Sequence, residues 1–329
     1  MARARIAVLG AGGTIAMAGA HPFDWIDYGD TGIIRDVDAL VATLDLGLPD
    51  VELLPVAVRA LPSTGITPSD WSALAAVVDK VLTDDRADGV VITHGTASLE
   101  ETAFFLHLVH RHAAPVVVVG AQRPPNTASS DAVANLRAAA VVAASGLFAE
   151  AGVLVVMNGC VYPARDASKL ANHALDAFDA VEFGPLARVE ADGTVTVARL
   201  LPRRAVAPFV LTAVPLPRVD IALSYAGADG AAIDGFVAAG ARGIICAGLP
   251  PGRSTPMERA AALRAVAAGV TVVQSSRALK GRVPLQRYNV ADDILSGGGL
   301  NPHKARILVM LALASDMSLV ELQAALLAI

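Results

Sequence analysis

Short runs rich in valine and isoleucine alternate with longer segments of helical periodicity, and this alternation constrains the fold more than any other feature of the sequence. Such alternation is typical of βαβ units, in which the strands pair in parallel. In the first half of the chain, the runs predicted to form strands are 6–9, 51–58, 89–93, 116–120 and 152–157. The sequence therefore predicts an α/β protein with a mainly parallel sheet.

Helix signals lie between these runs. Thr67 is placed to cap a helix, with Pro68 at its first position and Asp70 in its first turn. In SLEETAFFLHLVHR, two glutamates come early and basic residues come late, which complements a helix dipole at both ends. Thr96 is therefore expected between a strand and a helix, at the edge where open α/β sheets bind ligands.

A proline-containing stretch separates this first series from a second one. Because 329 residues exceed what one hydrophobic core usually supports, two domains are expected. We predict an N-terminal domain over 1–205, a linker over 206–218 and a C-terminal domain over 219–329. In the last of these, strands are expected at 221–224, 243–246 and 270–274, and helices at 303–314 and 318–327.

Composition narrows the choice of partners. The chain is 54% hydrophobic and 17% charged, with 4% aromatic residues, which suits helices packed on a buried sheet. Its net charge is −5 and it has no long basic run, so we expect a small-molecule partner and neither nucleic acid nor a membrane surface. Cys160 and Cys246 lie in apolar runs and are expected to be buried thiols, which indicates a reducing compartment.

The N-terminal segment MARARIAVLGAGGTIAMAGA permits two interpretations. Basic residues, an apolar run and a small-residue end imitate a signal peptide. Gly10, Gly12 and Gly13 interrupt the run, however, and the same residues suit a buried strand that leads into a glycine turn. We favour the strand and a cytoplasmic location. No apolar stretch is sufficiently long and free of glycine to be a convincing membrane span.

Thr14 follows the glycine turn in VLGAGGTIA. The turn is not a dinucleotide fingerprint, because Ile15 stands where the third glycine would be, and it lacks the Gly-Lys-Ser/Thr end of a phosphate-binding loop. An ordinary tight turn is the simplest interpretation. Glycine nevertheless allows a substrate to approach the backbone closely, and the hydroxyl of Thr14 would then lie beside it.

Three further segments carry candidate chemistry, each with a simpler alternative. Thr96 in HGTASLEET is either a helix cap or a hydroxyl beside backbone N–H groups that stabilise an oxyanion. Lys169 is either a solvated loop residue or, if it meets Thr96 in space, a base whose pKa burial lowers. Ser63 is either a turn residue or a ligand for a substrate carboxylate. The histidines of HLVHRH lack the acids or cysteines that would complete a zinc site, so no metal is expected.

Taken in order, five motifs resemble one known family. They are GGTIA, HGTxxxEET, VVVVGAQRP, VVMNG with a downstream ARDxSK, and LNPHKAR, and they span nearly the whole chain. This pattern is similar to that of the L-asparaginase/glutaminase amidohydrolases. The resemblance implies a larger N-terminal α/β domain and a smaller flavodoxin-like C-terminal domain. It also implies a homotetramer of intimate dimers, active sites between subunits and no cofactor.

The resemblance assigns catalytic roles to four residues. Thr14 corresponds to the primary nucleophile on a mobile loop, and Tyr28 corresponds to the loop tyrosine that activates it. Thr96 and Lys169 correspond to a second threonine and its lysine partner. Such residues describe attack of a threonine on a side-chain amide, release of ammonia, and hydrolysis of the acyl-enzyme by water.

It also assigns substrate contacts, to Gly13, Ser63, Gly95, Ala97 and Ala121. Ser63 corresponds to the residue that holds the substrate's α-carboxylate. The backbone N–H of Ala121 would form an oxyanion hole together with Thr96. The implied substrate is therefore a small amide that resembles asparagine.

Three positions depart from the family pattern at the end of the site that binds the substrate ammonium. Ala97 stands where the family has an aspartate, and Arg253 and Gln286 fall near two positions that a neighbouring subunit contributes. An ammonium without counter-charges is strongly disfavoured in a low-dielectric pocket. We therefore expect a substrate without a free α-ammonium, such as an N-acylated, cyclic or ω-amide compound.

Two alternatives stay open at this point. The first is an ordinary L-asparaginase in which another acid, for instance Asp166, replaces the missing aspartate. The second is a noncatalytic sensor of small ligands on the same scaffold. Retention of Thr14, Thr96 and Lys169 together favours an enzyme, because ligand binding alone would need neither two hydroxyls nor a base.

Overall fold

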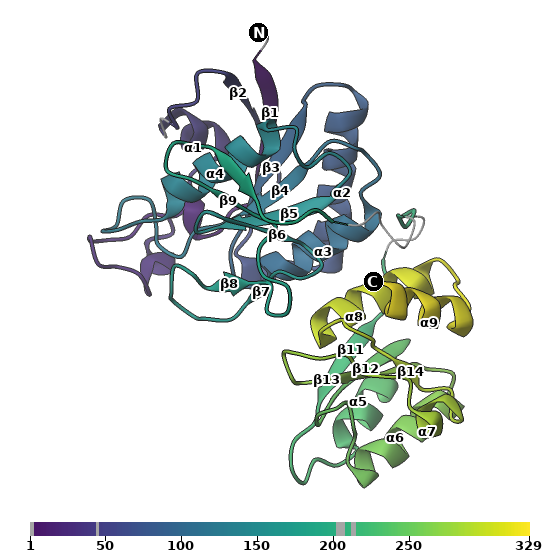
Figure 1. Cartoon of the computed structure of the whole chain (residues 1–329). Helices are drawn as coiled ribbons and strands as arrows, with labels where there is room; N and C mark the ends of the chain where they lie inside the picture. The colour runs from purple at the N-terminus through teal and green to yellow at the C-terminus, as the bar shows by residue number, and fades with distance from the viewer. Residues whose placement is uncertain (1–2, 44–45, 202–207, 212–214) are drawn as a thin grey trace. The chain divides into compact units, whose positions relative to one another are not determined.

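A computed structural model describes residues 3–43, 46–201, 208–211 and 215–329 (Figure 1). The chain divides into two compact units, Met1–Arg203 and Arg204–Ile329, and each is described by itself. Parts of the predicted linker, 206–207 and 212–214, lie outside the described residues, so the linker stays a prediction.

The N-terminal unit is built on an eight-stranded sheet with the order β10-β9-β6-β5-β4-β3-β1-β2. Its strands are β1 Ala4–Gly10, β2 Val51–Val56, β3 Gly89–Thr93, β4 Val116–Val119, β5 Val153–Met157, β6 Cys160–Pro163, β9 Ala187–Val189 and β10 Val195–Val197. The strands from β2 to β5 pair in parallel. Each of the five predicted strands overlaps one of them, which confirms the α/β fold with a mainly parallel sheet.

An antiparallel extension of the sheet was not predicted. β5 and β6 pair through a two-residue turn at Asn158 and Gly159, whose φ angles are 50° and 70°. Positive φ at both positions is what a type I′ hairpin requires, and Asn-Gly is its preferred sequence. The dipeptide in VVMNGCVY was therefore a hairpin signal that the strand–helix alternation obscured. A separate two-stranded sheet, β7 Ser168–Lys169 with β8 Phe178–Asp179, completes the strands described in this unit.

Helices pack against the parallel strands (Figure 1). They are α1 Val37–Thr43 beside β2, α2 Pro68–Thr83 against α3, α3 Leu99–Val109 on β4 and β5, and α4 Ala132–Ala144 on β1, β3, β4 and β5. Successive side chains of a strand point to opposite faces, so a run such as Val116–Val119 is buried along its whole length only where both faces are covered. α2 begins as predicted, with a capping box between Thr67 and Asp70.

The carboxyl ends of β1, β3 and β4 lie side by side. Gly10 at the end of β1 pairs with Thr93 at the end of β3, which in turn pairs with Val119 at the end of β4. The segments that follow therefore leave the sheet at one edge: 11–14, 94–98 and 120–123. Motifs that lie far apart in the sequence meet at this edge because the parallel register aligns the strand ends.

The C-terminal unit contains a smaller, fully parallel sheet with the order β11-β12-β13-β14. Its elements are β11 Val219–Leu223, α5 Ala231–Ala238, β12 Gly243–Gly248, α6 Pro256–Ala267, β13 Thr271–Ser276, α7 Arg287–Val290, β14 Leu295–Ser296, α8 Pro302–Ala314 and α9 Leu319–Ala328. The predicted strands overlap β11, β12 and β13, and the predicted terminal helices overlap α8 and α9. α5 and α6 pack together, while α8 packs on the sheet.

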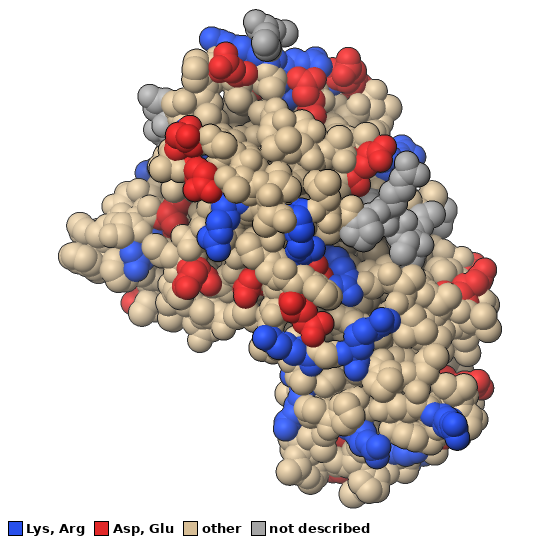
Figure 2. Space-filling view, viewed as in Figure 1, with Lys and Arg blue, Asp and Glu red and all other residues tan. Residues whose placement is uncertain are grey.

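The surface of the N-terminal unit carries both signs of charge. On the face shown in Figure 2, its acidic and basic side chains are intermixed over a largely uncharged surface. Exposed pairs such as Arg5 with Asp88 (3.0 Å) and Lys80 with Asp84 (3.4 Å) contribute to this mixture. Among the residues described, no helix is long and apolar enough to cross a membrane.

Candidate active site

The glycine turn after β1 brings the Thr14 segment against the segment after β3. Gly12 and Gly13 have φ angles of 92° and 87°, in the region that favours glycine. A side-chain carbon at Gly13 would lie 2.2 Å from the backbone nitrogen of Gly95, so only glycine permits this approach. Thr14 begins the short 3₁₀ turn Thr14–Ala16 and is 7% exposed.

Tyr28 contacts Thr14 directly. The two hydroxyl oxygens are 2.7 Å apart, and either group can donate the hydrogen bond. Tyr28 lies in a second 3₁₀ turn, Tyr28–Thr31, where the Thr31 hydroxyl contacts the Tyr28 carbonyl oxygen at 2.9 Å. The phenol can therefore exchange a proton with Thr14.

The loop that carries Tyr28 is attached to the segment after β4. The side-chain amide of Asn126 donates to the Gly19 carbonyl oxygen (2.7 Å) and accepts from the Gly19 N–H (2.8 Å). The guanidinium of Arg123 lies 4.0 Å from the centre of the Trp25 ring, a favourable cation–π distance. These contacts hold the loop over the sheet edge.

Thr96 contacts Lys169. The Lys169 amine donates to the Thr96 Oγ1 at 2.7 Å, and the Thr96 hydroxyl lies 3.5 Å from the side-chain oxygen of Gln122. The alternative that Thr96 caps the following helix is wrong, because α3 begins at Leu99 and its N-cap is Ser98. Thr96 is 7% exposed, so this contact is largely shielded from water.

Lys169 is half-buried and has no acidic partner at its amine. Burial lowers the pKa of the Lys169 ammonium below its ordinary value. Across the described part of the chain, no carboxylate forms an ion pair with Lys169 within 4.0 Å. The carboxylate of Asp166 pairs instead with Arg165 and, at 3.8 Å, with Arg199. The arrangement thus favours a lysine that can lose its proton.

Gln122 belongs to the same cluster, although it was not among the predicted site residues. Its side-chain oxygen accepts a hydrogen bond from the Lys169 amine at 3.3 Å. Its position in GAQRP, shortly after β4 ends at Val119, was the available signal, since β4 ends at the same edge as β3. A side chain there can reach the neighbouring segment, which only the sheet order reveals.

The other predicted substrate contacts lie at this edge as well. A side-chain carbon at Gly95 would lie 2.5 Å from the Ser63 hydroxyl oxygen and 3.2 Å from the Gly13 Cα. The Ser63 carbonyl oxygen accepts a hydrogen bond from the Ser98 hydroxyl at 2.7 Å. Ala121 is buried in the segment after β4, and Ala97 is exposed. Gly13, Ser63 and Gly95 therefore form one continuous patch of backbone and hydroxyl groups.

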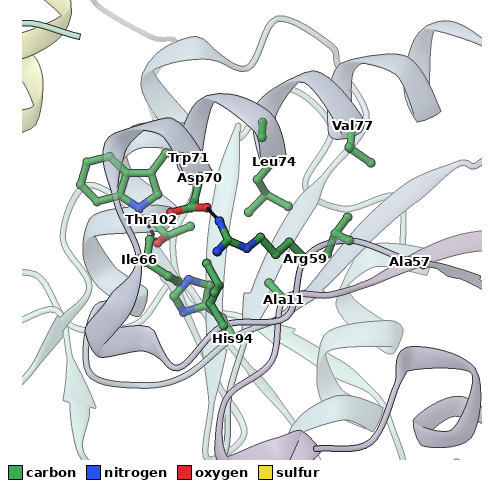
Figure 3. Close-up of a pocket in the computed structure, with 13 residues that line it drawn as sticks. Ala11, Ala57, Arg59, Ile66, Asp70, Trp71, Leu74, Val77, His94 and Thr102 are labelled. Carbon is green, nitrogen blue, oxygen red and sulfur yellow. Dashed lines mark hydrogen bonds and ion pairs between the residues drawn. The ribbon is translucent and has the colours of Figure 1, made fainter. Parts of the chain in front are cut away.

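A pocket of about 260 Å³ lies between α2 and the segments of the site (Figure 3). Ala11 and His94 line it, and each immediately precedes a glycine of the site. The ring of His94 is fully buried, which lowers its pKa to about 4, and its Nδ1 lies 2.8 Å from the Gly95 carbonyl oxygen. Neither Thr14 nor Thr96 lines this pocket, so it is separate from the two hydroxyl groups.

In the C-terminal unit, two positions that the sequence predicts to depart from the family pattern lie close together. The Gln286 side-chain amide donates to the carbonyl oxygen of Gly252, the residue before Arg253, at 3.2 Å. The guanidinium of Arg253 lies 5.8 Å from the centre of the Tyr288 ring. Arg253 and Gln286, which lie far apart in the sequence, thus belong to one surface.

The histidines of HLVHRH contact different groups, and the ring centres of His110 and His112 also lie 5.8 Å apart. His107 accepts from the Val153 N–H at 3.4 Å, and His112 lies 2.8 Å from an Asp79 oxygen. Nowhere in the described ranges do three or more His, Cys, Asp or Glu side chains gather in a way that could hold a metal ion. Cys160 and Cys246 are both free and buried, and burial raises the pKa of the Cys246 thiol to about 12.

Comparisons with known proteins agree with this architecture. The family model for the asparaginase N-terminal domain matches residues 5–202, and that for the glutaminase/asparaginase C-terminal domain matches 218–326. L-asparaginase 2 of Escherichia coli is 36% identical over 95% of this chain and 90% of that protein. The glutaminase-asparaginase of Pseudomonas fluorescens is 34% identical over 97% and 89%.

A solved structure is similar over the same extent. The probable cytoplasmic L-asparaginase of Campylobacter jejuni has a TM-score of 0.91 and 32% sequence identity, with 99% of this chain and 100% of that chain covered. The relatives named as L-asparaginase and glutaminase-asparaginase are hydrolases that act on carbon–nitrogen bonds other than peptide bonds. One family model matches each unit, and the relatives match nearly the whole chain. The chain therefore belongs to the asparaginase family of amidohydrolases.

Proposed function

We propose that the protein hydrolyses a small amide that lacks a free α-ammonium, with Thr14 as the nucleophile. One observation carries the proposal: each of two hydroxyls contacts a proton-transferring group at 2.7 Å, while the residue after Thr96 is an alanine. The hydroxyl pairs support amide hydrolysis. Ala97 supports the altered substrate.

In the first half of the reaction, the Thr14 oxygen attacks the amide carbon while its proton passes to the Tyr28 oxygen and the phenol passes its own O–H proton to the amide nitrogen. The carbon–nitrogen bond then breaks. Ammonia departs, and the acyl group stays bound to Thr14 as an ester. The N–H of Ala121 and the hydroxyl of Thr96 stabilise the negative charge on the carbonyl oxygen.

In the second half, water replaces ammonia. The unprotonated amine of Lys169 accepts a proton through Thr96 while water adds to the ester carbon. The ester bond breaks, the proton taken up by Lys169 returns through Thr96 to the Thr14 oxygen, and the acid product leaves. Low exposure of both threonines favours these steps, because charge–dipole interactions are stronger away from water.

The environment of the ammonium position favours a substrate without that charge. Ala97 supplies no carboxylate, and the two residues that the resemblance assigns to a neighbouring subunit, Arg253 and Gln286, are one basic and one neutral group. The alternative of a relocated acid at Asp166 is disfavoured, because its carboxylate already pairs with Arg165 and Arg199. A noncatalytic sensor is disfavoured because it would not require the two hydroxyl contacts.

We also propose the assembly and location that the family resemblance implies, a homotetramer of intimate dimers in the cytoplasm. The gap between the two matched family models, 203–217, supports the predicted linker over 206–218 between domains 1–205 and 219–329. Sedimentation of the full chain tests the assembly. A fully active monomer would contradict it.

Ammonia release from a panel of amides tests the function. The panel contains asparagine, glutamine, their N-acyl forms, succinamate and cyclic dipeptides that carry an asparagine or glutamine side chain, and Thr14→Ala is the control for spontaneous hydrolysis. We expect an N-acylated, cyclic or ω-amide substrate to exceed asparagine in kcat/KM by about tenfold or more, the scale of one charged contact. Preference for free asparagine would establish an ordinary L-asparaginase, and no release from any amide would favour the sensor.

A further inference from the structure

Gln122, Thr96 and Lys169 form a closed triangle of contacts. The Lys169 amine donates to the Thr96 oxygen (2.7 Å) and to the Gln122 side-chain oxygen (3.3 Å), and the Thr96 hydroxyl lies 3.5 Å from that same oxygen. The amide oxygen therefore faces both groups that are proposed to move protons. Its NH₂ group could not take this place, because two donors would then face each other.

The backbone of Gln122 is held by a buried polar network. Both carboxylate oxygens of Asp131 accept from the Gln122 N–H at 3.0 Å, and one also accepts from the Arg123 N–H at 3.0 Å. Asn135 donates to Asp131 (2.9 Å) and to the Gly120 carbonyl oxygen (3.0 Å). Gln122 is 8% exposed, Asp131 7% and Asn135 1%. The segment that carries the amide is therefore fixed to α4.

This network reaches the neighbouring strand. The side-chain oxygen of Asn135 accepts from the Asn158 N–H at 2.9 Å, at the turn that follows β5. The ends of β4 and β5 are thus joined through one side chain of α4. A residue held in this way keeps its position when a substrate enters, which is the condition for pre-organised catalysis.

The charged groups around Lys169 leave its amine without an acid. Glu100 on α3 accepts from the Lys169 backbone N–H at 3.5 Å, through Oε1, and not from the amine. Asp179 on β8 lies opposite Ser168 in the strand pair, and Asp166 is paired with Arg165 and Arg199. The amine therefore has two oxygen acceptors, the hydroxyl of Thr96 and the amide of Gln122, and neither carries a charge.

We propose that Gln122 is a positioning residue of this amidohydrolase, whose amide oxygen directs the Lys169 amine at Thr96 without placing negative charge beside it. A carboxylate in the same place would hold the lysine equally well but would stabilise its protonated form. The neutral amide holds the lysine in place without stabilising its protonated form. The inference rests on the proposed function, since it assumes that Lys169 accepts a proton during turnover.

Two substitutions separate position from charge. Gln122→Glu keeps the oxygen and adds a charge, whereas Gln122→Met keeps the approximate size and removes the oxygen. Ser69→Glu, on the exposed first turn of α2, adds the same charge away from the cluster and is the matched control. Thermal unfolding of each variant establishes that it is folded before activity is compared.

The protonation of Lys169 is measured first, without substrate, by NMR titration of lysine labelled with ¹³C at Cε. We expect the wild type to titrate below the ordinary lysine range, in agreement with its burial. Gln122→Glu should move the Lys169 titration upward by about one to three pH units, the usual effect of an adjacent opposite charge. Ser69→Glu should leave it in place. An unchanged titration in Gln122→Glu would overturn the inference.

The pH profile of kcat/KM is measured next, on the best amide of the panel. Because unprotonated Lys169 is the active form, the rate rises with pH through the pKa of Lys169, and Gln122→Glu should move this rise upward together with the titration. At neutral pH, each rise of one pH unit in the titration midpoint should lower its rate about tenfold. Gln122→Met should lower kcat about ten- to hundredfold with little change in KM, and without an upward shift, because the oxygen directing Lys169 is lost.

These outcomes distinguish the two proposals. If the Lys169 titration responds as expected but no amide releases ammonia, the contact stands and the proposed function fails. If ammonia is released and Gln122→Met retains full kcat, Gln122 is structural and the inference fails. A loss of stability without the expected shift in Gln122→Glu would lead to the same conclusion.

Discussion

The two hydroxyls of the site are held by different kinds of structure. Thr14 contacts a phenol 14 residues away on the same loop, whereas Thr96 contacts groups 26 and 73 residues away, on the segment after β4 and on β7. The Thr14 pair is local and belongs to a loop attached by a few contacts. The Thr96 cluster is long-range and belongs to the packed sheet edge. The Thr14 pair therefore depends on the conformation of one loop, whereas the Thr96 cluster depends on the order of the strands in the sheet.

The two regions meet at a close approach of their backbones. Gly13 and Gly95 place their backbones against each other, and Ser63 lies against Gly95. Substrate bound beside this approach would contact both regions. Variants of each region, and of the approach itself, show whether the two hydroxyls depend on each other through it.

The largest effect is expected when either region loses its reacting group. Thr14→Ala and Lys169→Met should each reduce kcat/KM by at least several hundredfold, the scale for loss of a nucleophile or a base. Folding should persist, because neither group belongs to the apolar core. Ammonia release and circular dichroism measure the two properties. Activity within tenfold of wild type in either folded variant would contradict the assigned roles.

A smaller loss is expected where the two regions touch. Gly13→Ala places a carbon 2.2 Å from the Gly95 nitrogen and forces alanine to a φ of 87°, so the two segments must separate. We expect activity to fall about a hundredfold, as it does when reacting groups are displaced by about 1 Å. Gly65→Ala is the control, because no atom lies within 4 Å of its added carbon. Similar activities for the two variants would show that the close approach is unimportant.

The smallest effect is a gain at the Thr96 region. Ala97→Asp restores one carboxylate, and a charge-assisted contact to an ammonium contributes about 1.5–3 kcal/mol. The kcat/KM for asparagine should rise about ten- to hundredfold. Turnover of a substrate with a blocked amino group should not rise, because such a substrate offers the new carboxylate no ammonium to contact. If the wild type already hydrolyses asparagine efficiently and Ala97→Asp does not change its kcat/KM, Ala97 does not determine the specificity.

Much of the fold could be predicted because its signals are local. Continuous apolar runs identified the parallel strands, and Thr67 with Asp70 marked the start of α2 within a single turn. The antiparallel hairpin was missed although Asn158 and Gly159 signalled it, because the strand–helix alternation around it favoured helical crossovers. Helices α5 and α6 were not assigned either, although Thr255 and Glu258 form a capping box at the start of α6. A local signal therefore predicts an element only where the surrounding pattern of strands and helices does not favour a different one.

The site could be predicted in part. Residues in short local motifs were found, whereas residues whose contacts join distant parts of the sequence were found conditionally or not at all. Thr14 and Thr96 each lie in a short motif with glycine before the hydroxyl, so the sequence selected them. Lys169 was conditional on a meeting with Thr96, and Gln122 was not selected, because its contact depends on the order of strands in the sheet. The sequence also left open whether Thr96 was a cap, which Ser98 settled.

The sequence by itself determined which groups are present: two glycine-preceded hydroxyls, a lysine, and an alanine directly after the second hydroxyl. The tertiary structure decided which of them meet. Parallel pairing of β1, β3 and β4 aligned their ends, the close approach of Gly13 to Gly95 joined two segments, and burial lowered the pKa of Lys169 beside Gln122. The physical reason is that distances between remote segments, and the exclusion of water between them, arise only when the chain packs.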